Sequence, residues 1–251
     1  MEDDPRETRS ELLQPAERVV MLSGASRGIG AALARRLLAD GFRLSLGVRR
    51  PADARAKFGE LGAERLLVCR FDAFDANTAQ AWVDETKAHF GRIDALINNA
   101  GLTKPLSFAE GGEDALDDLW AVNVKAPFRL IRLALPHLSQ SGNGRIVNVA
   151  STDAKRYRDG TVSIAYAMTK HAVLALTHAA KFAGWEHGVR VTALCPGAVD
   201  TDFTAGIPGV TPAANRMAPT TLAEIVSLLL RLPNNASVAE LVVNTRLEST
   251  L

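Results

Sequence analysis

From Arg18 onward, short runs of apolar and β-branched residues alternate with longer stretches that carry the period of a helix. This alternation predicts βαβ units, in which each helix crosses over to join two parallel strands. Repeated crossovers of this kind build a doubly wound α/β domain. We therefore predict a mainly parallel sheet of about seven strands with helices on both faces. The predicted strands are RVVMLSG, FRLSLGV, ERLLVCRFD, RIDALINNAG, GRIVNVAS, VRVTALCPG and AELVVN.

The helices between these strands are placed by their apolar spacing. After the first strand, Ile29, Leu33 and Leu37 recur every fourth residue, and Gly41 stands where a left-handed cap would end the helix. Further helices are predicted in AWVDETKAHF, over about 116–139, over about 163–185 and in TLAEIVSLLLRL.

Length and composition limit the domain organisation. A chain of 251 residues with 47% hydrophobic and 23% charged residues can form one large α/β domain, predicted here over residues 18–251. Residues 1–17 are charged and contain proline, which predicts a flexible N-terminal arm. The Pro/Gly-rich stretch at about 200–218 is too long for a simple connection and favours a substrate lid, with a disordered insertion as the alternative.

Charge and cysteine content narrow the class of function. Lys plus Arg number 29 and Asp plus Glu number 28, so no overall field favours nucleic acid or a membrane surface, and a small-molecule partner is expected. Cys69 and Cys195 fit neither a disulfide framework nor a metal pair, which favours two buried thiols and a cytoplasmic location. The sequence contains no apolar run of membrane-spanning length, and no third ligand accompanies His171 and His178 at zinc spacing.

The stretch SGASRGIG, residues 23–30, fits two incompatible chemistries. One is G-x-S-x-G, the elbow that presents a nucleophilic serine, here Ser26, in α/β-hydrolases. The other is a phosphate-binding turn, because glycines at 24, 28 and 30 precede a helix whose dipole attracts anions. A hydrolase needs a histidine late in the chain, but the last one, His187, precedes the sixth strand. The cofactor turn is favoured, and a serine hydrolase is kept as an alternative.

The end of the second strand indicates which dinucleotide the turn would bind. In dinucleotide-binding folds, a residue about twenty positions past the glycines senses the adenosine ribose, and an acid there selects NAD. This chain has VRR at residues 48–50. Arg49 can bind a 2′-phosphate, and Arg27 can approach the same group from the glycine turn. The two arginines predict NADP(H) in preference to NAD(H).

A tyrosine and a lysine stand four residues apart in YAMTK, so Tyr166 and Lys170 project from one face of a predicted helix. A free tyrosine titrates at about 10, but a nearby ammonium favours the phenolate and lowers that pKa. Tyr166 would then be a usable general acid or base. Ser151 follows a strand at the edge where α/β sheets place their ligands, and Asn123 lies inside a predicted helix.

Together these motifs resemble the short-chain dehydrogenase/reductase (SDR) family over about residues 18–245. The family's T-G-x-x-x-G-x-G motif matches Ser23–Gly30 with serine in place of threonine. Its N-N-A-G motif matches residues 98–101, and its P-G motif matches residues 195–201. Its helical asparagine, serine, tyrosine and lysine match Asn123, Ser151, Tyr166 and Lys170. The resemblance implies a Rossmann-type fold and an NADP-dependent oxidoreductase that interconverts ketones and secondary alcohols.

The resemblance also implies a role for each matched residue. Tyr166 would transfer the proton, Ser151 would bind the carbonyl oxygen, and Asn123 would anchor a water that links Lys170 to solvent. Asp72 would bind the adenine, and Val199 and Thr201 the nicotinamide carboxamide. The implied cofactor-binding residues are Ser23, Gly24, Ser26, Arg27, Gly28, Ile29, Gly30, Arg49, Asp72, Asn99, Ala100, Gly101, Tyr166, Lys170, Pro196, Gly197, Val199 and Thr201.

The chain departs from the family pattern at two places. The segment between Ser151 and Tyr166 is slightly longer than usual and carries Lys155, Arg156 and Arg158. These cations would attract an anionic substrate at the mouth of the site, unless they only keep the loop solvated. The Gly-Gly that often follows the last strand is absent, so the sequence does not decide whether the family's usual tetramer contact around that strand forms.

Two further expectations follow from the resemblance. A homodimer or homotetramer is expected, formed by pairing of the helices at about 116–139 and 163–185. A non-catalytic NADP(H)-binding sensor of the same fold stays open as an alternative function.

Overall fold

The computed structural model describes residues 11–59, 62–205, 207 and 209–245. Its centre is a seven-stranded, fully parallel sheet in the order β3-β2-β1-β4-β5-β6-β7. The predicted doubly wound α/β fold is therefore confirmed. The strands are β1 Val19–Ser23, β2 Arg43–Val48, β3 Leu66–Arg70, β4 Ala95–Asn98, β5 Arg145–Val149, β6 Arg190–Pro196 and β7 Glu240–Val243.

Helices cover both faces of this sheet. They are α1 Gly28–Asp40, α2 Pro51–Phe58, α3 Ala76–Phe90, α4 Glu113–Trp120, α5 Ala126–Gln140, α6 Ile164–Gly184 and α7 Pro219–Arg231. A π-helical segment, Ala121–Lys125, joins α4 to α5, and short 3-10 turns occupy Thr152–Ala154, Trp185–His187 and Ala213–Asn215.

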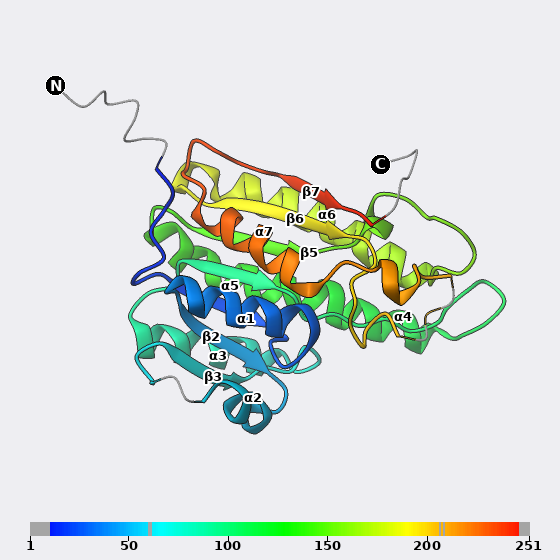
Figure 1. Cartoon of the computed structure of the whole chain (residues 1–251), viewed down its shortest axis with the longest axis horizontal. Helices are drawn as coiled ribbons and strands as arrows, with labels where there is room; N and C mark the ends of the chain where they lie inside the picture. The colour runs from blue at the N-terminus through cyan, green and yellow to red at the C-terminus, as the bar shows by residue number, and fades with distance from the viewer. Residues whose placement is uncertain (1–10, 60–61, 206, 208, 246–251) are drawn as a thin grey trace.

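The two helical layers are set by the alternation of side chains along each strand. On β1, Val20 and Leu22 pack into the cluster that contains α1 and α7, whereas Met21 packs into the cluster that contains α3 and α5. Figure 1 shows α1 and α7 side by side across one face, with α5 and α6 behind the sheet. Because strands buried on both faces need apolar residues throughout, the continuous apolar runs in the sequence are explained.

The helix ends follow the predicted signals in part. α1 ends at Gly41, whose φ is 100° and whose N–H bonds to the carbonyls of Leu37 and Leu38, as expected for a left-handed cap. The helix predicted at about 116–139 starts earlier, at Glu113, and the π-helical segment interrupts it. α2 was not predicted, because its eight residues bury only Ala54 and Phe58 and carry no clear apolar stripe.

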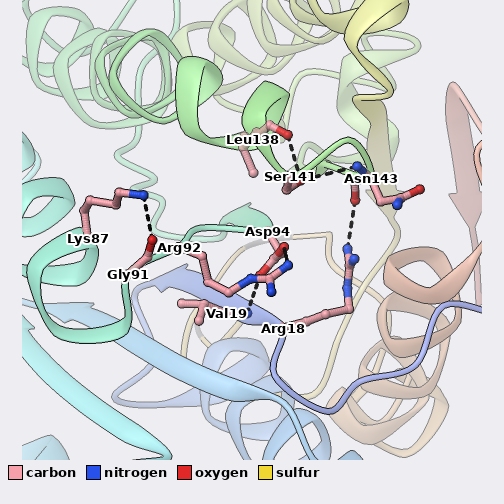
Figure 2. A network of polar contacts seen from close by, with 9 residues as sticks. All are labelled: Arg18, Val19, Lys87, Gly91, Arg92, Asp94, Leu138, Ser141 and Asn143. Atoms are coloured by element: carbon pink, nitrogen blue, oxygen red, sulfur yellow. Dashed lines mark hydrogen bonds and ion pairs between the residues drawn. The ribbon is translucent and has the colours of Figure 1, made fainter.

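The amino-terminal edge of the sheet carries a buried polar network (Figure 2). Asp94, which is fully buried, accepts bonds from Arg92 Nε at 2.8 Å and Nη2 at 2.7 Å, and from the Val19 backbone N–H at 2.9 Å. Arg18 Nη2 donates to the Asn143 carbonyl at 2.8 Å. The carboxylate of Asp94 thus ties the start of β1 to the residues that precede β4.

The described part of the predicted N-terminal arm, residues 11–17, runs beside α7. The Leu13 N–H donates to the Arg231 carbonyl at 2.7 Å. Residues 1–10 of the predicted arm lie outside the described residues.

Candidate active site

A cavity of about 590 Å³ opens at the carboxyl ends of the strands. This is the edge at which α/β sheets bind ligands, because strand ends and helix N-termini converge there. Most of the predicted site residues line it: Gly24, Ser26, Arg27, Gly28, Ile29, Gly30, Arg49, Asp72, Asn99, Ala100, Gly101, Ser151, Tyr166, Lys170, Pro196, Gly197, Val199 and Thr201. Ser23 and Asn123 are buried behind its wall.

The glycine turn owes its shape to close backbone contacts. Gly24 has a φ of +71°, and a Cβ on it would come within 2.9 Å of Ala100 Cα. A Cβ on Gly30 would lie 2.2 Å from the Gly24 carbonyl oxygen. These two glycines are required because the turn packs against itself and against the end of β4. Gly28, whose Cβ would face Thr201 at 3.2 Å, stands on the cavity side.

Ser23 and Asn99 hold the turn in place. Ser23 Oγ accepts bonds from the backbone N–H groups of Asn99 and Ala100, each at 3.0 Å. Asn99 Nδ2 donates to the carbonyls of Ser23 and Gly24 at 3.0 and 3.1 Å. The side chain of Ser23 is therefore used up by protein partners, and its contribution to a cofactor site is to position the turn.

Four cations gather where the glycine turn meets the end of β2. Arg27 lies 3.6 Å from Asp202, and Arg49 directly follows β2 and lines the cavity. Arg50 pairs with Asp53 at 2.8 Å. Lys57, on α2, donates to the Ser26 carbonyl at 3.0 Å. Lys57 is not among the predicted site residues, because no sequence pattern indicates the helix that carries it.

Asp72 and Thr201 occupy opposite parts of the cavity wall. Asp72 follows β3, and its Oδ1 accepts the backbone N–H of Phe74 at 3.1 Å. Val199 and Thr201 follow β6. There Thr204 Oγ1 donates to the Val199 carbonyl at 2.7 Å, and Val199 forms an isolated bridge with Met217. These contacts join the start of the predicted lid to its end and to the residues that follow β6.

Ser151, Tyr166 and Lys170 meet on the wall between β5 and α6. Ser163 caps α6 by accepting the Tyr166 N–H at 3.3 Å, so the helix begins at Ile164, two residues before the tyrosine. Lys170 lies one turn further on, with Nζ 5.5 Å from the centroid of the Tyr166 ring and 2.8 Å from the Val149 carbonyl oxygen. Ser151 directly precedes a 3-10 turn, and its Oγ accepts the Asp153 N–H at 3.1 Å.

Burial controls the titration of this group. Removal from water raises the pKa of Tyr166 above its ordinary value, and the charge of Asp153 adds to the rise, while a hydrogen bond from Ser151 opposes it. Burial also lowers the pKa of Lys170 to about 8. The predicted lowering of the Tyr166 pKa by Lys170 is therefore wrong. Desolvation outweighs the cation, whose ammonium donates to the Val149 carbonyl.

Asn123 lies in the π-helical segment, where the chain makes an extra-wide turn. Its Oδ1 accepts the Leu102 N–H at 2.8 Å, and its Nδ2 donates to the Leu102 carbonyl at 2.9 Å and to Thr169 Oγ1 at 3.1 Å. Both amide hydrogens are thus used by the protein. The side chain joins the segment after β4 to α6, close to Lys170.

The basic loop after Ser151 does not act as a unit. Arg158 lines the cavity, whereas Lys155 bonds to Glu240, the first residue of the outermost strand β7. Arg156 is not among the lining residues and has a partner of its own within the chain. The expectation that all three cations stand at the mouth of the site is correct for Arg158 alone.

The alternative of a serine hydrolase loses its geometric basis. Ser26 lines the cavity, but no histidine is among the described lining residues. A triad needs a histidine within hydrogen-bond reach of the nucleophile.

Among the described residues, no group of three or more His, Cys, Asp or Glu side chains is placed to hold a metal ion, and both cysteines are buried.

The fold and this cavity define a doubly wound α/β protein with a dinucleotide-type site at the carboxyl edge of its sheet. Comparison with known proteins then places it: residues 18–209 match the short chain dehydrogenase family, and the chain belongs to that family of oxidoreductases, whose fold binds a nicotinamide cofactor. Within the described residues, no helix combines the length and apolar character that crossing a bilayer requires.

Individual relatives are reductases and dehydrogenases. The chain is 40% identical over 221 residues to agropine synthesis reductase of Rhizobium rhizogenes, covering 88% of this chain and 50% of the relative. It thus spans about half the length of that protein. It is 36% identical over 198 residues to 2-(R)-hydroxypropyl-CoM dehydrogenase of Xanthobacter autotrophicus, covering 74% of this chain and 76% of the relative.

Among solved structures, the chain is similar to an alcohol dehydrogenase from Thermococcus sibiricus complexed with 5-hydroxy-NADP. The TM-score is 0.81 at 30% identity, and the match covers 90% of this chain and 95% of the other.

Proposed function

We propose that this protein is an NADP-dependent oxidoreductase that reduces a ketone to a secondary alcohol, or catalyses the reverse reaction, with Tyr166 as the general acid/base. The observation that carries the proposal is that one cavity holds both a dinucleotide-type site and a set of proton-transferring side chains. One end has the glycine turn flanked by cations, and the other has Ser151, Tyr166 and Lys170. NADPH, when bound, supplies the hydride that reduces the carbonyl carbon.

The cofactor end suits a dinucleotide that carries an additional phosphate. The glycine turn leads into the N-terminus of α1, where free backbone N–H groups and the helix dipole favour a pyrophosphate. Arg27, Arg49 and Lys57 surround the end of β2 and offer several donors to a 2′-phosphate. Asp72 would bind the adenine, and Val199 and Thr201 the nicotinamide carboxamide.

At the catalytic end, the titration of Tyr166 favours reduction. Because its pKa is raised, the phenol keeps its proton throughout the neutral range. An alkoxide forming on the substrate is a much stronger base than a phenolate, so Tyr166 can donate to it. Ser151 would donate a second hydrogen bond to the same oxygen. Lys170, protonated below about pH 8, would hold the cofactor ribose and return a proton to Tyr166.

Cofactor choice is tested by the dissociation constants of NADPH and NADH, measured by the fluorescence of the reduced nicotinamide. NADPH should bind more tightly, and Arg49→Ala should weaken NADPH binding roughly tenfold while leaving NADH binding unchanged. Lys181→Ala is the matched control. Lys181 lies on α6, its ammonium stands over the Trp185 ring, and it is not among the lining residues. Equal affinities in the wild-type protein would contradict NADP selectivity.

The reaction itself is tested with a panel of ketones and alcohols, followed by NADPH absorbance. A non-catalytic sensor would bind NADPH and turn over none of them. We regard the sensor as the weaker alternative, because a site that only detects a nucleotide has no need of three proton-handling side chains on one wall.

We also propose a cytoplasmic homodimer or homotetramer that is formed by α5 and α6. Large apolar side chains on these helices are exposed, with Phe128 at 50%, Met168 at 47% and Phe182 at 88% of their surface. Light scattering should show an oligomer that Phe182→Asp weakens. A wild-type monomer would contradict this assembly.

A further inference from the structure

Beyond the glycine turn, the cavity wall mixes apolar residues such as Leu102 and Phe203 with hydroxyl-bearing ones such as Thr152 and Thr161. Arg158 also lines this cavity, and only 18% of its side chain is exposed. A shielded cation on the wall of a ligand cavity is expected to contribute to ligand specificity. The reaction proposed above has no role for it.

Arg158 is held in one orientation and keeps donors available. Its Nε donates to Asp159 Oδ2 at 2.7 Å, and its Nη2 donates to Thr161 Oγ1 at 2.8 Å. A guanidinium has five N–H donors. Within the described part of the chain, three of them have no hydrogen bond, including both on Nη1. The Nη1–Nη2 edge is therefore free to form a forked pair with two oxygens.

The support behind Arg158 is itself anchored. Asp159 Oδ1 accepts bonds from the Thr161 N–H at 2.9 Å and from the Thr161 hydroxyl. These bonds and Arg158 hold the pKa of Asp159 well below its ordinary value, so the pair stays charged at any pH at which the protein would be assayed. A preset arginine of this kind loses little entropy when it binds a ligand.

The predicted lid also reaches this spot. Gly209 has a φ of +67°, and a Cβ placed on it would lie 2.6 Å from Thr161 Oγ1. Val210 follows it on the cavity wall. The guanidinium therefore stands where the loop after Ser151 meets the lid, partly shielded from solvent, and this shielding strengthens a charge-assisted hydrogen bond.

The neighbouring charges favour Arg158 over the other residues of the loop. Lys155 is engaged by Glu240, which also bonds to His178. Asp153 has a partner within the chain, and its charge acts on Tyr166, which places it at the reacting end.

From this geometry we propose that Arg158 binds an anionic group of the substrate, a carboxylate or a phosphate, through its free Nη1–Nη2 edge. The substrate is then a ketone that carries a carboxylate or a phosphate. This inference rests on the proposed function, since it names the substrate class of that reaction.

The test compares two matched pairs of ketones with NADPH: levulinate against methyl levulinate, and dihydroxyacetone phosphate against dihydroxyacetone. Wild-type protein should prefer the anionic member of at least one pair, and which pair it is separates carboxylate from phosphate. Arg158→Gln should lower kcat/KM for that anion roughly 10- to 100-fold and leave the neutral member nearly unchanged. Arg158→Lys, which keeps the charge but loses the fork, should fall between them.

Lys155→Gln is the matched control, since it removes one positive charge from the same loop without touching the cavity wall. It should keep the preference for the anion. The inference is overturned if the wild-type protein prefers both neutral members, if Arg158→Gln affects both members of a pair equally, or if Lys155→Gln has the same selective effect.

Failure of the proposed function would look different, because NADPH would not bind or no ketone in either pair would be turned over. Calorimetric titration of levulinate and of inorganic phosphate, with NADP+ present, then decides the inference separately. Binding that Arg158→Gln abolishes supports it. Binding that is absent, or equal in wild type and variant, overturns it.

Discussion

The two edges of the sheet bury charge in opposite ways. At the amino edge, the carboxylate of Asp94 accepts three bonds and Arg18 Nη2 donates to a backbone carbonyl (Figure 2), although Arg18 Nε has no hydrogen bond among the described residues. At the carboxyl edge, the half-buried Tyr166 and the buried Lys170 line a cavity of about 590 Å³. The groups at the carboxyl edge are thus placed where a ligand in the cavity can reach them, whereas those at the amino edge contact protein groups.

The difference also shows in the titration of the cations. Arg145, the first residue of β5, donates to the carbonyls of Gly144, Gly188 and Leu232, and burial beside Arg18 lowers its pKa to about 9. That value leaves the guanidinium charged at neutral pH. Burial lowers the pKa of Lys170 to about 8, close enough to neutrality for the group to exchange protons. Burial therefore leaves Arg145 permanently charged at neutral pH, whereas it brings Lys170 into the range in which it can act as an acid.

The largest effect is expected at the carboxyl edge. Tyr166→Phe removes the proton donor and one hydrogen bond to the developing oxyanion, and we expect kcat to fall roughly 10³- to 10⁴-fold. NADPH should still bind, as measured by fluorescence, and the free energy of unfolding should change by less than about 1 kcal/mol. A variant that loses stability in step with activity would show that the two edges are not separable.

The next effect is expected at the amino edge. Asp94→Asn removes the buried carboxylate that accepts bonds from Arg92 and from the Val19 N–H, and the free energy of unfolding in urea should fall by about 2 kcal/mol. The turnover of the molecules that remain folded should match wild type. Asp53→Asn, which breaks an exposed pair with Arg50, is the control and should cost less than about 1 kcal/mol. A similar loss in both variants would argue against the special role of the buried network.

A smaller effect is expected from Lys170→Met. The pKa of Lys170 falls from 10.5 to about 8, so the charged form costs the folded state about 3 kcal/mol. Loss of the bond to Val149 offsets part of that gain, and the variant should be more stable at pH 7 by about 1–2 kcal/mol and inactive.

The pH dependence of the stability difference between Lys170→Met and wild type shows whether the charge of Lys170 causes it. Between about pH 8 and 10.5 the unfolded state binds more protons at Lys170 than the folded state, so the wild-type protein gains stability as pH rises. The advantage of Lys170→Met should therefore be constant below about pH 8 and shrink above it. A difference that does not vary with pH, in urea unfolding at several pH values, would mean that packing and not charge is responsible.

Sequence patterns predicted the architecture because strands buried on both faces and capped amphipathic helices leave local signals. The Gly41 cap and the positions of Ser151, Tyr166 and Lys170 are examples, since each depends on a spacing within one element. The π-helical segment around Asn123 left no such signal. Its bonds go to Leu102 and Thr169, and contacts that distant cannot be read from AVNVK itself.

The remaining differences have the same origin in long-range contacts. Gly24 and Gly30 are needed because of Ala100 and of the turn's own backbone, not only to leave room for a ligand. Lys155 and Arg158 look alike in the sequence, yet Lys155 does not line the cavity, because it bonds to Glu240, which is far along the chain. Lys57 joins the cofactor end only because α2 folds back toward Ser26.

Transfer of label from the cofactor to the product tests the proposed reaction most directly. NADPH carrying deuterium on one face of the nicotinamide C4 would be mixed with a ketone that the protein turns over, and the alcohol analysed by mass spectrometry. Hydride transfer predicts one deuterium on the carbinol carbon from one of the two labelled stereoisomers and none from the other. An alcohol without deuterium from either isomer, or label released to water, would contradict the proposed reaction.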